Sequence, residues 1–521
     1  MFTQPPRLTL AALSLQLLLS ACSATAQSPP HPEATRWPEP RPVAWPQPIQ
    51  APRVQTLPNF QAPSAPHCAR AIVTREVPGL MPGQQGSTWR GRGSAHESAR
   101  LDKAAPSAPV AGAPSAPTGA SRDAAVAAAP APSLSAAPLA ESKAQAEARN
   151  SAYAEGAAPA PLAPGIAQPQ RPVSPLVTAG MVDDNADFAG YLGFRQRTRV
   201  AHRARDVSER YLLEVKDARG QGVPDAEVAV QSPRGHAMWA RTDTAGRVWL
   251  HPNAFDPARS AVYEVAVRKD GRQSGAILQR GQKSAVEVTL GARSGFFAGT
   301  PRARLDLVFL IDATGSMADE IDKLKATLQT IAAEVAALPS APDLCFGLVA
   351  YRDRGDAFLT RSHDLTHDLG AFQGVLNALH ADGGGDYPEA MNEALHETVH
   401  NLSWRGDGAT RLVFLLADAP PHLDYGGPQY DDDMLAALGK GIKIFGVGAS
   451  GLDRQGEYIQ RQIAQYTGGR FVFLTYAQAH QPSSGPGRET VHDVKNYSVD
   501  TLDRLIVRLV SEELARLPKG G

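Results

Sequence analysis

Three short polar motifs in the C-terminal part of the chain hold the residues best suited to chemistry. The first is Asp312-x-Thr314-x-Ser316, the second is a glycine-rich run that ends in Asp386, and the third is Asp418. Carboxylate and hydroxyl oxygens are hard ligands, of the kind that Mg²⁺, Mn²⁺ and Ca²⁺ prefer. If the fold brings the three motifs together, they form a site for a divalent cation.

The surrounding sequence predicts elements that would bring these motifs together. From residue 304 to 517, apolar runs of strand length alternate with stretches of helical length. This alternation predicts an α/β domain with a doubly wound, mostly parallel sheet and right-handed crossovers. Asp312 and Asp418 each follow a strand directly, and ligands of such folds bind beyond the carboxyl ends of the strands. The predicted elements are strands 305–311, 343–351, 411–417, 442–447 and 470–474, and helices 318–338, 388–401 and 498–517.

The three motifs and their order resemble the metal-ion-dependent adhesion site of the von Willebrand factor type A (vWA) family. Thr314 stands where the family pattern has Ser and keeps the hydroxyl, while Asp386 stands where many members have Thr and adds a negative charge. The resemblance implies a non-enzymatic domain that binds a divalent cation, most often Mg²⁺, and through it an acidic residue of a protein partner. It implies no small-molecule substrate.

Two other interpretations of the motifs stay open. Thr314 and Ser316 could merely cap a helix. Alternatively, the first motif resembles the aspartyl-phosphate loop of haloacid-dehalogenase-type phosphohydrolases, in which Asp312 would be a nucleophile assisted by magnesium. Those enzymes also need a downstream lysine and an acidic motif. Lys440 and Lys443 are present, but no Gly-Asp-x-x-x-Asp follows them.

Residues 208–292 have the pattern of a small all-β sandwich. Short alternating strands are separated by turn residues, as in such folds. The segments Gly222–Ala226 and Thr242–Gly246 resemble carboxypeptidase-regulatory or immunoglobulin-like modules of surface proteins, which implies a spacer or adhesive role. The predicted strands are 211–215, 227–230, 247–250, 263–267 and 286–290.

Residues 1–21 have the features of a signal peptide, with Arg7 followed by an apolar run. The run ends in Leu19-Ser20-Ala21-Cys22, which resembles the lipobox of bacterial lipoproteins and implies lipidation of Cys22. Ser23 after the cysteine implies the outer membrane of a Gram-negative cell envelope. Plain secretion with cleavage after Ala26 is the alternative.

Residues 22–174 are rich in Ala, Pro and Ser, which predicts a long disordered tether. Cys68 lies in it and is expected to be a free thiol, whereas Cys345 is expected in the core of a buried strand. Residues 175–207 are interpreted as a short, partly ordered connector. There, Asp183 and Asp184 are expected at the N-terminal end of a helix, with calcium binding as the alternative.

The net charge also excludes some functions. The 521 residues include 52 Lys and Arg against 53 Asp and Glu, a formal charge of -1. A non-specific nucleic-acid binder needs a strong basic surplus, so that class is excluded. The acidic run Asp431–Asp433 is expected to open a helix, because carboxylates are favoured at helix N-termini.

Overall fold

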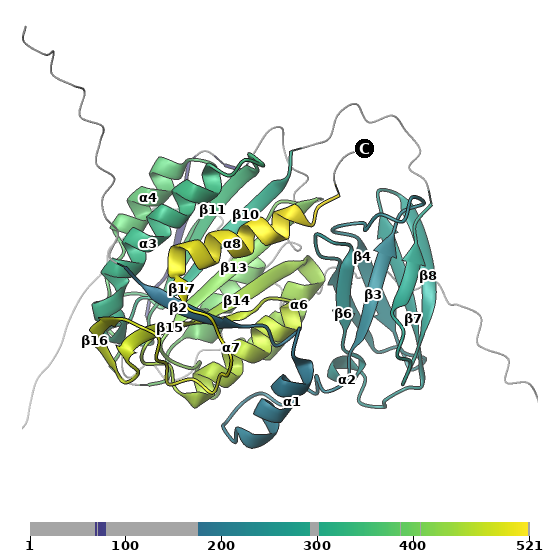
Figure 1. Cartoon of the computed structure of the whole chain (residues 1–521), viewed down its shortest axis with the longest axis horizontal. Coiled ribbons are helices and arrows are strands. Elements are labelled where there is room, and N and C mark those ends of the chain that lie inside the picture. The colour runs from purple at the N-terminus through teal and green to yellow at the C-terminus, as the bar shows by residue number, and fades with distance from the viewer. Residues whose placement is uncertain are drawn as a thin grey trace, which may run out of the picture. The chain divides into compact units, whose positions relative to one another are not determined.

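The computed structural model describes residues 68–69, 71–79, 176–291, 302–385, 387–406 and 408–518 (Figure 1). These residues form one large sheet covered by helices and two smaller sheets. The predicted signal peptide, Cys22 and most of the predicted tether lie outside the described residues, as does Asp386. In the part of the chain that is described, no helix has both the length and the hydrophobicity needed to cross a bilayer.

Parallel strands form the centre of the large sheet, in the order β11-β10-β13-β14-β15. Nearly all of their residues are buried and apolar, as expected for strands covered on both faces. The predicted α/β domain is therefore confirmed at its centre. The strands are β10 (Arg304–Asp312), β11 (Asp343–Tyr351), β13 (Ala409–Ala417), β14 (Ile442–Gly448) and β15 (Phe471–Gln478).

Helices cover both faces of this sheet (Figure 1). Alternate residues of a strand point to opposite faces. In β10, Leu307 and Phe309 belong to one buried cluster with helices α3, α4 and α8, whereas Val308 and Leu310 belong to another with α5, α6 and α7. The helices are α3 (Ala318–Ala336), α4 (Leu369–Asn377), α5 (Met391–His396), α6 (Tyr430–Lys440), α7 (Arg454–Thr467) and α8 (Leu502–Ala515).

The sheet as a whole is mixed, which corrects the prediction of a mostly parallel sheet. On one side, β12 (Thr360–Thr366) runs antiparallel to β11. On the other side, β2 (Thr178–Val182) runs antiparallel to β15, and β17 (Asp500–Thr501) to β2. The strand β16 (Gln481–Pro486) also pairs with β15. Strand β2 comes from the segment interpreted as a connector, so that segment is partly a component of the sheet.

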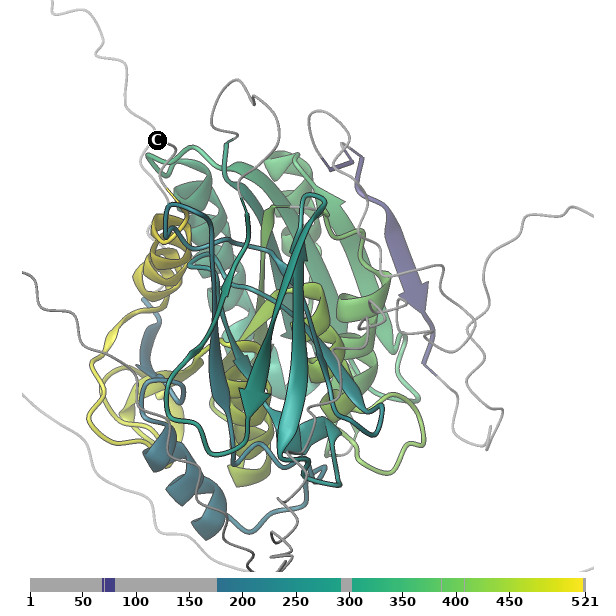
Figure 2. The ribbon, with the colours of Figure 1, turned by 90° about the vertical axis from the view of Figure 1, so that its right-hand side faces the viewer.

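A segment of the predicted tether also belongs to the sheet. Strand β1 (Thr74–Val77) pairs antiparallel with β12 and is the outermost strand on that side of the large sheet; it is drawn in purple in Figure 2. Just before it, Cys68 forms a disulfide with Cys345 of β11. The expectation of disorder is therefore wrong for residues 68–69 and 71–79, and so is the expectation of a free thiol at Cys68. Cys345 is buried as expected.

The helix that follows β2 begins later than predicted. Helix α1 (Phe188–Arg197) is capped by Asp187, whose carboxylate accepts from the amide of Gly190. Asp184 instead forms a buried ion pair with Arg461 of α7, at 2.6 Å. Asp183 accepts amide hydrogen bonds in the preceding turn. These partners account for both carboxylates without calcium.

Two smaller sheets are formed by the strands that lie between α1 and β10 in the sequence. One has the order β6-β3-β9 and the other the order β5-β4-β7-β8. Inward residues of both, such as Leu213 and Val228, belong to one buried apolar cluster. The strands are β3 (Tyr211–Lys216), β4 (Glu227–Gln231), β5 (Ala237–Arg241), β6 (Arg247–Leu250), β7 (Val262–Lys269), β8 (Arg272–Gln279) and β9 (Val286–Thr289), with the short helix α2 (Pro252–Phe255) after β6.

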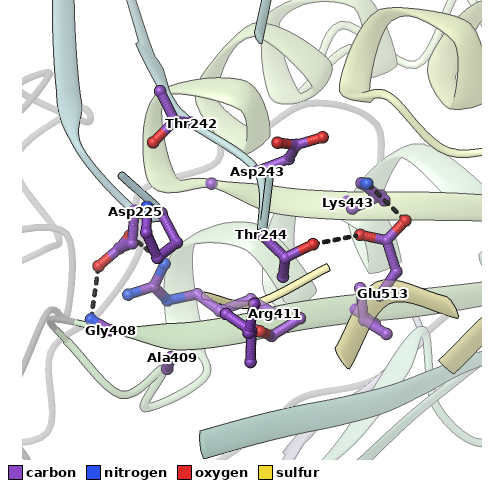
Figure 3. Close-up of a pocket in the computed structure, with 14 residues that line it drawn as sticks. Asp225, Thr242, Asp243, Thr244, Gly408, Ala409, Arg411, Lys443 and Glu513 are labelled. Carbon is purple, nitrogen blue, oxygen red and sulfur yellow. Dashed lines mark hydrogen bonds and ion pairs between the residues drawn. The ribbon is translucent and has the colours of Figure 1, made fainter. Parts of the chain in front are cut away.

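A buried ion cluster around Asp225 joins the smaller sheets to the large one (Figure 3). Asp225 precedes β4, and its carboxylate contacts Arg411 of β13 at 3.0 Å and Arg241 at 3.1 Å. It also accepts from the amide of Gly408 at 2.6 Å. These positive charges hold the pKa of Asp225 below its ordinary value although burial acts in the opposite direction. The cluster therefore fixes the amino end of β13, a central strand of the large sheet, to the start of β4.

A second polar contact lies beside it. Glu513 of α8 accepts from the hydroxyl of Thr244 at 3.2 Å and pairs with Lys443 at 2.8 Å (Figure 3). Lys443 is the second residue of β14, so it lies at the amino end of the parallel strands.

Candidate metal centre at the carboxyl edge of the sheet

Asp312 and Asp418 lie at the carboxyl ends of two neighbouring parallel strands. Asp312 is the last residue of β10, and Asp418 directly follows β13. Because the two strands pair in register up to Ile311 and Leu416, the two carboxylates come to the same edge of the sheet. Asp312 has no exposed surface, and Asp418 is 4% exposed.

The loop after β10 holds two hydroxyl groups at the same edge. Thr314 donates to Oδ1 of Asp312 through its amide, at 3.0 Å, and through its hydroxyl, at 2.7 Å. The hydroxyls of Thr314 and Ser316 are 3.1 Å apart. Oδ2 of Asp312 and Oδ1 of Asp418 are buried and have no hydrogen-bond partner. The site thus presents two buried carboxylate oxygens that nothing in the described chain satisfies.

The electrostatics of the site favour a positive charge. Burial, and after it the charge of Asp418, raises the pKa of Asp312 to about 7. Burial also raises the pKa of Asp418, and its neighbours Ser316 and Asp312 act in the opposite direction. Buried like charges cost free energy unless a proton or a cation compensates them.

The glycine-rich loop borders Thr314. The amide of Gly315 donates to the carbonyl of Gly383 at 2.9 Å, and the amide of Gly384 donates to Asp356 at 2.9 Å. Gly384 has a φ of +67°, and a Cβ there would lie 2.9 Å from the Cβ of Thr314. Only glycine fits this close approach in that conformation. Asp386, predicted as a ligand in this loop, is not among the described residues.

Two further buried groups belong to this site, although neither was predicted as part of it. Burial raises the pKa of Glu389 to about 9, with Asp312 the largest of several nearby carboxylates that add to it. Its Oε2 is buried without a partner. The hydroxyl of Tyr351 is also buried beside Asp312. Burial and nearby charge arise only in the folded chain, so the residue pattern contained no signal for either role.

The residues present fit a hard divalent cation. Such ions take oxygen ligands, and the site offers hydroxyl groups together with carboxylate oxygens that lack partners. The cation would be held by the carboxylates of Asp312 and Asp418 and the hydroxyls of Thr314 and Ser316. Glu389 stands next to them, and without a cation its pKa is raised by burial and by these carboxylates.

Comparisons with known proteins agree with this fold. The family model of the von Willebrand factor A domain matches residues 306–425. A putative ariadne-like RING finger protein of Acanthamoeba polyphaga mimivirus is 32% identical over 121 residues, and the alpha-protein kinase vwkA of Dictyostelium discoideum is 29% identical over 119. Each alignment covers 23% of this chain, but only 12% and 19% of those proteins.

Among solved structures, the SpRpn10 VWA domain matches with 16% identity and a TM-score of 0.24. The match covers 31% of this chain and 82% of that domain. The family match begins at Asp306 and includes both Asp312 and Asp418, the two strand-end carboxylates of the candidate site. The C-terminal part of this chain therefore contains a von Willebrand factor A domain.

Proposed function

We propose that the vWA domain binds a divalent cation at the carboxyl edge of its sheet and, through that cation, a protein partner. The observation that supports this most directly is the pair of buried carboxylate oxygens without partners, on Asp312 and Asp418. Mg²⁺ is the proposed ion, with Mn²⁺ and Ca²⁺ as substitutes, because every candidate ligand is an oxygen. The proposed ligands are Asp312, Thr314, Ser316, Asp386 and Asp418.

The protein groups determine how the site would act. Asp312 is held in place by two hydrogen bonds from Thr314, so its second oxygen is oriented without cost when an ion binds. When bound, the cation supplies an open coordination position for a carboxylate of the partner. The domain is therefore proposed to be a binding module and not an enzyme.

The rest of the chain would present this domain at a cell surface. We propose that Cys22 is lipidated and anchors the chain to the cell envelope, at the outer membrane of a Gram-negative bacterium. The Pro, Ala and Ser-rich sequence between Cys22 and residue 68 would then separate the domain from the membrane. In this arrangement the smaller sheets would act as a second adhesive surface and not as a spacer, because they are inserted between β2 and β10 of the large sheet.

Isothermal calorimetry with Mg²⁺ on the full chain tests the metal site. The wild type should bind Mg²⁺ and Asp312→Ala should not, whereas Asp322→Ala, at an exposed carboxylate of α3, should bind as the wild type does. Partner capture from an envelope extract should need Mg²⁺ and fail with Asp312→Ala. If capture survives chelation and no divalent cation binds at millimolar concentration, the proposed mechanism is wrong.

The competing phosphohydrolase interpretation needs a lysine near Asp312. Lys443 lies at the amino end of β14, opposite the carboxyl edge that holds Asp312, and pairs with Glu513. Lys440 ends α6 just before β14 and donates to the carbonyl of Val399 at 2.6 Å. Both positions count against this interpretation. Turnover of an aryl phosphate that is lost in Asp312→Asn would reverse this conclusion.

A further inference from the structure

A second cluster of metal-ligating side chains lies between α5 and α6, apart from the carboxyl-edge site. His396 ends α5, His400 lies in the π-helical turn Glu397–Asn401 that follows, and Asp433 lies in the first turn of α6. Nδ1 of His396 and Nε2 of His400 are each 3.0 Å from Oδ1 of Asp433. One ligand atom from each residue lies within 4.8 Å of both others.

The local sequence explains why these side chains meet. The two histidines are four residues apart, which places them on one face of a helical segment, and their rings stack at 4.3 Å. Asp433 belongs to the acidic run Asp431–Asp433 that was expected to open a helix, and α6 does begin at Tyr430. The acidic run does more than place negative charge at the N-terminus of α6. Asp433 contacts the two histidines, while Asp431 pairs with Arg203 and Arg205.

The cluster is almost closed to solvent. The side chains of His396, His400 and Asp433 are 15%, 10% and 4% exposed. Oδ2 of Asp433 is buried and has no hydrogen-bond partner. Hydrogen bonds from the two histidines to Oδ1 account for that oxygen alone. A carboxylate oxygen left unsatisfied in a nearly dry site is an acceptor that a bound ion or a water molecule can satisfy.

We propose that His396, His400 and Asp433 bind a transition-metal ion, with Zn²⁺ as its occupant. Imidazole nitrogens with one carboxylate are a donor set that suits Zn²⁺, and they do not suit Mg²⁺. With metal–ligand bonds of about 2.0–2.1 Å, tetrahedral ligand atoms lie roughly 3.3 Å apart. The two histidine–aspartate distances of 3.0 Å are close to this spacing. A water molecule would complete the coordination.

The five residues 396–400 read His-Glu-Thr-Val-His, a pattern found in zinc metalloproteases, where the glutamate is the general base. In this chain the glutamate is engaged elsewhere. The carboxylate of Glu397 accepts from Ser362 of β12 at 2.7 Å and from Arg75 of β1 at 3.2 Å, and it also accepts from Asn401. The proposed site therefore binds a metal and joins α5 to α6, but it is not proposed to hydrolyse peptides.

One nearby charge opposes the metal. Lys440 lies two turns after Asp433 in α6. Burial lowers the pKa of its ammonium group to about 8, while the negative charge of Asp433 acts to raise it. That group donates to the carbonyl of Val399. A neighbouring positive charge weakens cation binding, so Lys440 should lower the affinity of the cluster for Zn²⁺.

Cobalt substitution tests the proposal on the full chain. The protein is stripped with a chelator, and Co²⁺ is added in the presence of excess Mg²⁺, which occupies oxygen-ligand sites. We expect one equivalent of Co²⁺ with visible ligand-field absorption, which Zn²⁺ then displaces. His400→Gln and Asp433→Asn should each weaken binding by more than about 100-fold, since even the loss of an outer-shell partner costs 10–100-fold.

Three controls separate the outcomes. Asp312→Ala, at the carboxyl-edge site, and Glu397→Gln should keep the cobalt spectrum, and His422→Gln tests a histidine outside the cluster. Circular dichroism checks that each variant folds, and a Zn²⁺-induced rise in melting temperature should be absent in His400→Gln. If the wild type gives no ligand-field bands, or His400→Gln gives the same bands, the three residues form only a hydrogen-bonded cluster and the proposal is wrong. Peptidase activity that requires Glu397 would contradict the role assigned to that residue.

Discussion

The burial of Asp312 predicts an unusual pH dependence of stability for the metal-free protein. Its pKa is about 7 in the folded chain and 3.8 ordinarily. Between these values the folded state binds a proton that the unfolded state does not, so the free energy of unfolding falls as pH rises. Three pKa units at ~1.4 kcal/mol each give about 4 kcal/mol as an upper bound. Because Asp418 shares the effect, we expect ~2–4 kcal/mol.

Scanning calorimetry in the presence of a chelator measures this effect. In a domain of this size, 1 kcal/mol shifts the melting temperature by about 2–4 °C. Because only about two of the three pKa units lie between pH 5 and pH 7, wild type should lose about 5–10 °C from pH 5 to pH 8 relative to Asp312→Asn, whose amide cannot ionise. Mg²⁺ should remove most of that loss, because a bound cation compensates the carboxylates in place of the proton. Asp322→Asn, at an exposed position, should follow the wild type.

Two results would refute this reasoning. The first is a difference between wild type and Asp312→Asn that stays constant from pH 5 to pH 8, which would mean that Asp312 ionises normally. The second is a loss that persists unchanged with saturating Mg²⁺. In that case the site would hold a proton but not a cation, and the proposed binding mechanism would lose its basis.

Three further predictions concern other parts of the chain. Asp225→Ala leaves Arg411 buried without its carboxylate, so chemical denaturation should show a loss of about 3–5 kcal/mol. Cys68→Ser removes a disulfide that closes a long loop, so stability should fall by about 2–4 kcal/mol, and the amides of Thr74–Val77 should exchange hydrogen much faster by mass spectrometry. Cys22→Ala should move the protein from the membrane fraction to the soluble fraction and abolish palmitate labelling, whereas a wild type that is soluble and begins at Gln27 would mean plain secretion.

The centre of the large sheet could be predicted from sequence because each central strand is covered on both faces. Such strands must be apolar at nearly every position, and runs such as Leu305–Ile311 are visible without any knowledge of the fold. The same reasoning predicted that Asp312 and Asp418 lie at one edge of the sheet. Each directly ends a buried strand, and the carboxyl ends of parallel strands lie at the same edge.

The edge strands could not be predicted in this way. Strand β1 consists of Thr74-Arg75-Glu76-Val77, with no residue fully buried, and it pairs on one side only. Its stability comes from a partner almost 300 residues later and from the disulfide of Cys68, and neither leaves a local pattern. Strand β2 is similar, because the same short segment would suit a linker until β15 supplies its hydrogen bonds.

The cluster around Asp433 illustrates how far a motif can be interpreted without its surroundings. The spacing of His396 and His400 alone brings two imidazoles together, because four residues make about one helical turn. The role of the glutamate between them depends on contacts that spacing does not determine. Ser362 and Arg75, from strands far apart in the sequence, hold the carboxylate of Glu397 at the sheet edge. Arg75 belongs to β1, in the segment that was expected to be a disordered tether. The strand that was not predicted therefore supplies a contact that holds Glu397 away from the general-base role the pattern would otherwise suggest.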